Sequence, residues 1–137
     1  AWMNKELEDF YAQMQFKKEV IWIEKIDRTD LLQLMQHAFG LVYPSLFEGF
    51  GIPILEAMTL GLPVICSNTS SMPEVAENAA LHVQPDNTIE IANAMNELII
   101  NDELRNDLIA KGKLRAIHFN WNISAEKVVG IIKSYQK

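Results

Sequence analysis

The sequence has 137 residues, of which 49% are hydrophobic and 22% are charged, and its formal net charge is −6. These values are typical of one globular domain with a single core, and they exclude a disordered chain and a nucleic acid binder, which needs clustered lysine and arginine. The longest apolar run is far shorter than the ~20 residues that span a bilayer, and no signal peptide pattern begins the chain, so we expect a cytoplasmic protein.

The first half of the chain alternates helix and strand signals. Apolar residues spaced by three and four positions predict an amphipathic helix over 4–16, and a short apolar run predicts a buried strand over 20–23. Asp27 is a suitable N-cap for a helix that ends near Gly40. A strand over 41–43, a loop, a helix over 53–60 closed by Gly61 and a strand over 63–66 follow. The single cysteine, Cys66, lies in this last strand and is expected to fill the core.

The second half continues the alternation. A polar loop over 67–71 precedes a short helix opened by Pro73, and a strand over 80–83 comes next. Helices are predicted over 88–100, 102–119 and 124–135, with Trp121 anchoring the junction of the last two. Four methionines within helical patterns are expected to fill the core: Met14, Met35, Met58 and Met95. The alternation predicts an α/β fold, a doubly wound, Rossmann-like parallel sheet with helices on both faces.

A strand, a loop and a helix form the segment Y-P-S-L-F-E-G-F-G-I-P-I-L-E, in which seven residues separate Glu48 from Glu56. Unpaired N–H groups at a helix N-terminus favour phosphate, and carboxylates are strong acceptors for sugar hydroxyls. Together they complement a nucleotide sugar. The same residues also fit a purely structural explanation, in which Glu56 favours the first helical turn, Glu48 is solvated, and Gly49 and Gly51 supply positive φ.

The polar loop over 67–71 is expected to lie beside the first loop, because both follow the carboxyl ends of parallel strands. We therefore predict that this second loop, and Asn68 and Thr69 in particular, contacts the same ligand. Loops rich in serine and threonine also occur simply as solvated turns.

The segment from Tyr43 to Pro73 closely resembles the C-terminal domain of retaining glycosyltransferases of family 4, also called group 1, which have the two-domain GT-B architecture. The resemblance continues through E-V-A at 74–76 to F-N-W at 119–121. It implies that Glu48 is catalytic and meets the hydroxyls of the donor sugar, and that Glu56 accepts hydrogen bonds from the nucleotide ribose. The resemblance also implies that four donor-binding residues offer backbone N–H groups: Gly49, Phe50, Gly51 and Ile52.

The resemblance further implies what this sequence does not contain. Residues 1–137 correspond to a single, partial nucleotide-sugar-binding domain, the incomplete C-terminal half of a GT-B fold, and 123–137 to a helix that crosses to the N-terminal domain. The acceptor-binding domain, the first strands and the cations that neutralise the departing diphosphate have no match. We therefore expect an enzyme as part of its full-length parent, and a nearly inactive fragment alone.

The implied partners are a nucleoside diphosphate sugar, with guanine or uracil as the base, and an acceptor glycan or lipid-linked saccharide bound by the missing domain, at the inner face of the membrane. Bacterial polysaccharide or lipopolysaccharide assembly is the expected setting. The helix start and the S-N-T-S-S-M-P-E stretch resemble those of bacterial mannosyltransferase-like members, which implies a mannose-type donor. No cofactor or metal is expected, since the three histidines have no ligand spacing. Two alternatives are a non-catalytic nucleotide-binding domain and an interaction module that pairs through an exposed sheet edge.

Overall fold

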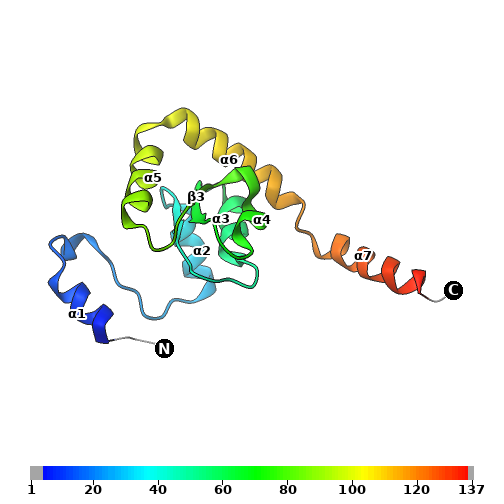
Figure 1. Ribbon diagram of the computed structural model, residues 1–137, viewed down its shortest axis with the longest axis horizontal. Coiled ribbons are helices and arrows are strands. Elements are labelled where there is room, and N and C mark those ends of the chain that lie inside the picture. The colour runs from blue at the N-terminus through cyan, green and yellow to red at the C-terminus, as the bar shows by residue number, and fades with distance from the viewer. Residues whose placement is uncertain (1–4, 136–137) are drawn as a thin grey trace.

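The computed structural model describes residues 5–135, and it consists of a small parallel sheet covered by helices (Figure 1). Asn4, the predicted first residue of the N-terminal helix, and the last two residues of the predicted helix over 123–137 lie outside the described range. The described elements are α1 (Lys5–Gln13), η1 (Lys17–Glu19), α2 (Arg28–Gln36), β1 (Leu41–Tyr43), α3 (Ile52–Leu60), β2 (Val64–Ser67), α4 (Met72–Ala76), η2 (Glu77–Ala79), β3 (Leu81–Val83), α5 (Thr88–Ile100), α6 (Asp102–Ile117) and α7 (Trp121–Ser134).

The three strands pair in the order β1-β2-β3, and both pairs are parallel. The register sets Val42 opposite Ile65 and Cys66 opposite His82. Parallel neighbours joined by helices confirm the predicted α/β fold. Strands β1 and β3 are the edges of this sheet among the described residues, and pairing of an edge with a second copy stays a prediction.

Strand β2 is buried along its whole length because helices cover both faces of the sheet. Its side chains alternate between two apolar clusters: Val64 and Cys66 belong to the cluster built with α3 and α4, and Ile65 belongs to the cluster built with α5 and α6. Cys66 is fully buried, as predicted. The sequence of the central strand is therefore largely a continuous apolar run, which is typical of a parallel sheet covered by helices on both faces.

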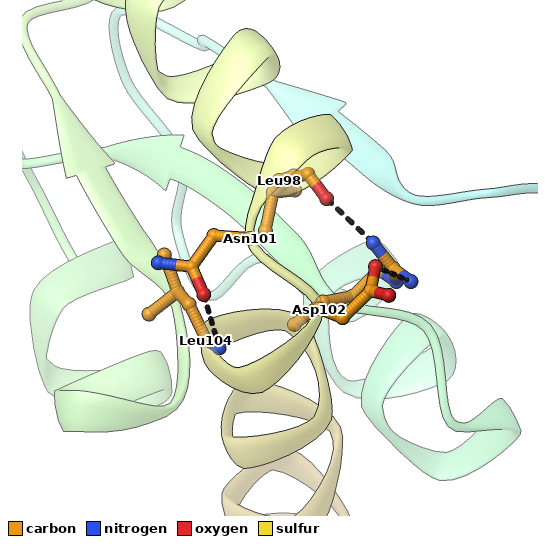
Figure 2. Close-up of polar contacts among 5 residues, drawn as sticks. Leu98, Asn101, Asp102 and Leu104 are labelled. Atoms are coloured by element: carbon orange, nitrogen blue, oxygen red, sulfur yellow. Dashed lines mark hydrogen bonds and ion pairs between the residues drawn. The ribbon is translucent and has the colours of Figure 1, made fainter.

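Capping residues determine where several helices begin and end. The side chain of Asp27 accepts a hydrogen bond from the backbone N–H of Asp30 at 2.9 Å, and Gly61 closes α3 with φ 78°, both as predicted. Asn101 separates α5 from α6, and its side chain accepts from Leu104 N–H at 3.0 Å (Figure 2). The guanidinium of Arg105 donates to the carbonyl of Leu98 across the same corner at 2.9 Å. These bonds fix the turn between the two helices that cover the second face.

The predicted strand over 20–23 is wrong. This segment makes no ladder with β1 or any other described strand, and Ile21 is 85% exposed. An apolar run becomes a strand only where a neighbouring backbone can accept and donate the ladder hydrogen bonds, and no described segment lies there to do so. The helix α1, with no buried residue, lies with this segment at the edge of the structure (Figure 1).

Two predictions about the core are also wrong. Trp121 is 90% exposed at the start of α7 and does not anchor a helix junction, and Met95 lies on the solvent side of α5. Met35 and Met58 are buried as predicted, whereas Met14 is half-buried just beyond α1. Helix α7 begins at Trp121, three residues earlier than predicted, and projects away from the sheet with no buried residue (Figure 1). That it crosses to a second domain stays a prediction.

Candidate functional site

The loop between β1 and α3, which we call the motif loop (residues 44–51), leaves the carboxyl end of β1 and ends at the N-terminus of α3. Gly51 is the N-cap of α3 and has φ 93°, a conformation that glycine adopts without strain. A Cβ at this position would lie 3.2 Å from Cδ1 of Ile54. Gly49 does not have positive φ, so the turn requires glycine at only one of the two positions.

Two hydroxyl groups hold the carboxylate of Glu48. Tyr43 Oη donates to Glu48 Oε1 at 2.6 Å, and Ser45 Oγ donates to the same oxygen at 3.0 Å. No described residue donates to the other oxygen, Oε2, which is therefore available to a ligand hydroxyl. The carboxylate is thus fixed in one orientation at the end of the sheet, unlike a freely solvated loop residue.

Burial raises the pKa of Tyr43 to about 12, and the hydrogen bond and negative charge of Glu48 add to that shift. The phenol therefore stays protonated, and able to donate to Glu48, well above its ordinary pKa of 10.0. Burial also raises the pKa of the Cys66 thiol to about 12.

These two shifts predict a loss of stability at alkaline pH. The ordinary pKa values are 9.0 for Cys66 and 10.0 for Tyr43, so the unfolded chain releases these protons before the folded chain does. Their contribution is complete below pH 9 and is lost as the pH rises toward 12. We expect the urea midpoint to fall between pH 8 and 10.5, and to fall less in Cys66→Ala than in the unsubstituted protein. Equal pH dependence of the two proteins would contradict the shift at Cys66.

Glu56 lies one turn into α3, and its carboxylate forms an ion pair with Arg28, the first residue of α2. The distance from Arg28 Nη2 to Glu56 Oε1 is 2.6 Å, and the side chains are 75% and 16% exposed. Helix α3 begins at Ile52 and carries no acidic residue in its first turn. The purely structural explanation of Glu56 as a first-turn glutamate is therefore wrong. Sequence reasoning missed Arg28, because no local signal links residues 28 positions apart.

Four consecutive backbone N–H groups, at the end of the motif loop and in the first residue of α3, make no hydrogen bond to any described residue: those of Gly49, Phe50, Gly51 and Ile52. Unpaired N–H groups of this kind, together with the positive end of a helix dipole, are suited to an anion. These are the residues that the family resemblance predicts to offer their amides to the donor, and that role stays a prediction.

An aromatic contact joins the motif loop to the end of α6. The rings of Phe50 and Phe119 meet edge to face with centroids 5.6 Å apart, and the guanidinium of Arg115 lies 4.8 Å from the Phe119 ring centroid. Arg115 in turn donates to the carbonyls of Glu74 and Val75, at 2.6 and 2.9 Å. The motif loop is therefore supported from α6 as well as from its own strand and helix.

The second loop, 67–71, lies directly against the motif loop. Ser67 Oγ donates to the carbonyl of Ser45 at 2.6 Å, and Thr69 Oγ1 donates to the carbonyl of Leu46 at 3.3 Å. The prediction that the two loops lie side by side at the carboxyl ends of the strands is confirmed. These hydroxyls face the protein backbone, and contact of Asn68 or Thr69 with a ligand stays a prediction.

Other parts of the structure offer little to a ligand. Within residues 5–135, no group of three or more histidine, cysteine, aspartate or glutamate side chains is placed to hold a metal ion. No helix in that range is long and apolar enough to cross a membrane. A hollow of about 430 Å³ lies between α1 and residues 17–24, and no residue of the motif loop lines it. The motif loop remains the candidate site.

Solved structures with this fold define the class of protein. Sucrose-phosphate synthase from Thermosynechococcus elongatus superposes with a TM-score of 0.82 at 25% identity, over 96% of this chain and 34% of that one. The C-terminal domain of the group 1 glycosyl transferase LpcC from Francisella tularensis superposes with a TM-score of 0.72 at 29% identity, over 83% and 60% of the two chains. The fold is that of the C-terminal half of GT-B glycosyltransferases.

Sequence comparison identifies the family. The model of glycosyl transferases group 1 matches residues 3–115, and the chain belongs to this family. It is 38% identical to O-antigen chain mannosyltransferase B of Escherichia coli over 104 residues, which are 76% of this chain and 27% of that protein. It is 40% identical to O-antigen chain mannosyltransferase RfbU of Salmonella typhimurium over 80 residues. The chain spans about a quarter of the length of these two relatives. The predicted resemblance is confirmed.

Proposed function

We propose that this chain is the donor-binding part of a retaining glycosyltransferase, which transfers a sugar from a nucleoside diphosphate sugar to an acceptor hydroxyl. The observation that carries the proposal is the row of four unpaired backbone N–H groups, Gly49 to Ile52, between two carboxylates at the end of a parallel sheet. The amides suit the diphosphate, and the carboxylates suit hydroxyl groups of the sugar and ribose.

The roles of the two glutamates differ in this proposal. Glu48 has one oxygen held by Tyr43 and Ser45, which leaves Oε2 for a hydroxyl of the transferred sugar. Glu56 has one oxygen held by Arg28, and the other accepts from the ribose. The positive charge of Arg28 also offsets one of the two negative charges beside the diphosphate. This offset reduces the repulsion between the carboxylate of Glu56 and the diphosphate, because like charges repel.

The names of the relatives suggest the donor and the setting. Two of them are O-antigen chain mannosyltransferases, so we propose a mannose-type donor with guanine or uracil as its base, and a glycan or lipid-linked saccharide as acceptor. The setting is the assembly of a bacterial surface polysaccharide on the cytoplasmic side of the membrane. Acceptor binding and charge stabilisation of the departing diphosphate are assigned to other parts of the full-length protein, so this chain alone should transfer almost no sugar.

The test is calorimetric titration of the full-length protein with GDP, UDP, ADP and the corresponding mannose and glucose donors. Glu56→Gln should weaken every nucleoside diphosphate by about tenfold to a hundredfold, because a ribose hydroxyl loses a charged acceptor. Arg28 is largely exposed, so the loss of its partner should change stability little. The matched control is Glu103→Gln, which replaces an exposed glutamate in the first turn of α6.

Each outcome has a meaning. Binding of one nucleoside diphosphate that Glu56→Gln weakens and Glu103→Gln does not would support the donor site. A protein that binds none of these compounds would contradict the proposal. Binding without sugar transfer to any saccharide acceptor would favour the alternative of a non-catalytic nucleotide-binding domain.

A further inference from the structure

A group of hydroxyls on the second loop, which we call the hydroxyl clasp, holds the backbone of the motif loop. Its members are Ser67, Thr69, Ser70 and Ser71. The bonds converge most closely on one residue, Glu48. Its carbonyl accepts from Ser70 Oγ at 2.6 Å and from Ser71 Oγ at 2.9 Å, and its N–H donates to Ser70 Oγ at 3.3 Å.

These bonds fix the orientation of the peptide unit that joins Glu48 to Gly49. A trans peptide is planar, and its C=O and N–H point in opposite directions. Because two hydroxyls hold the Glu48 carbonyl on the side of the second loop, the N–H of Gly49 must point away from that loop. This N–H makes no hydrogen bond to a described residue. The clasp therefore determines where the first of the four unpaired amides points.

The direction of this peptide unit matters for an anion. If the unit turned over, a carbonyl oxygen would replace the N–H, and its negative partial charge would repel a phosphate that the N–H attracts. Two hydroxyl donors on one carbonyl oppose such a turn. Ser70 itself has φ 58°, an unfavourable conformation for a residue with a Cβ. Its hydroxyl reaches both polar groups of Glu48 from that backbone position.

We propose that Ser70 and Ser71 are positioning residues for the donor diphosphate, which they serve by keeping the Gly49 N–H directed at it. This inference rests on the proposed function. It assigns the two serines no contact with the donor. It predicts that their removal weakens binding of the phosphate part of the ligand and leaves binding of the nucleoside part unchanged.

The decisive variant is Ser70→Gly in the full-length protein. Glycine accepts φ 58° without strain, so this variant removes the hydroxyl without straining the backbone at this position. With the base identified by titration, we expect the affinity for the nucleoside diphosphate to fall about tenfold and that for the free nucleoside, which has no phosphate, to change less than twofold. Ser71→Ala should act in the same direction, and Ser71→Thr, which keeps the hydroxyl, should restore diphosphate affinity.

The matched control is Thr59→Ala, which removes a hydroxyl bonded to the carbonyl of Leu55 at 2.7 Å within α3. It should change neither affinity. Equal weakening of the nucleoside diphosphate and the free nucleoside by Ser70→Gly, or no change in either affinity, would overturn the inference. If the unsubstituted protein binds the nucleoside diphosphate and Glu56→Gln weakens that binding, such a result would contradict only the positioning role of Ser70 and Ser71. If the unsubstituted protein binds no nucleotide, the proposed function itself fails.

Discussion

Replacing Glu48 with glutamine is expected to slow sugar transfer by the full-length protein by about a hundredfold or more, with little change in nucleoside diphosphate affinity. Glutamine keeps the shape of the side chain and removes its negative charge. An interaction that strengthens as charge develops in the transition state affects the rate more than ground-state binding, and loss of one such group costs about a hundredfold or more. The measurement is kcat with the donor that titration identifies, together with the affinity for its nucleoside diphosphate.

Glu48 is suited to this test because its position is well defined. Tyr43 and Ser45 both donate to Oε1 of its carboxylate. The comparison with Glu56→Gln is informative, since that variant should lower nucleotide affinity more than kcat. A Glu48→Gln protein with unchanged kcat would contradict the role of Glu48. An equal loss of nucleotide affinity in both variants would show that the two glutamates are not divided between sugar and ribose.

Replacing Ile54 with alanine is expected to lower the free energy of unfolding by about 2–5 kcal/mol. Ile54 is fully buried in α3, in the cluster formed with α4 and β2, and its Cδ1 lies beneath Gly51 of the motif loop. Truncation removes apolar contact and leaves a cavity in a packed core. Urea denaturation followed by circular dichroism measures the change.

The matched control is Ile89→Ala in α5, where the same truncation occurs at a residue 72% exposed. We expect a change within about 0.5 kcal/mol, as for most surface substitutions. Similar destabilisation by both variants would contradict the assignment of Ile54 to the core. A large loss for Ile54→Ala alone would show that the packing beneath the motif loop contributes strongly to stability.

Local signals accounted for much of this fold. The apolar runs of β1, β2 and β3, the cap at Asp27 and the turn at Gly61 were all predictable, because each depends on a few neighbouring residues. The strand predicted over 20–23 failed because a strand needs a partner, and its local apolar pattern carries no information about one. The prediction that Trp121 anchors a helix junction was wrong for a related reason, because burial of a large side chain depends on what packs against it.

The site divides in the same way. The order of residues in the chain determined that two glutamates flank a glycine-containing turn into a helix, and this pattern alone indicates a nucleotide-sugar site. Only the tertiary structure decided which groups hold those glutamates. Arg28 meets Glu56 because α2 and α3 pack together. The serines of the second loop meet Glu48 because the parallel strands β1 and β2 have their carboxyl ends on the same side of the sheet. Contacts between residues distant in sequence depend on packing, which no local pattern encodes.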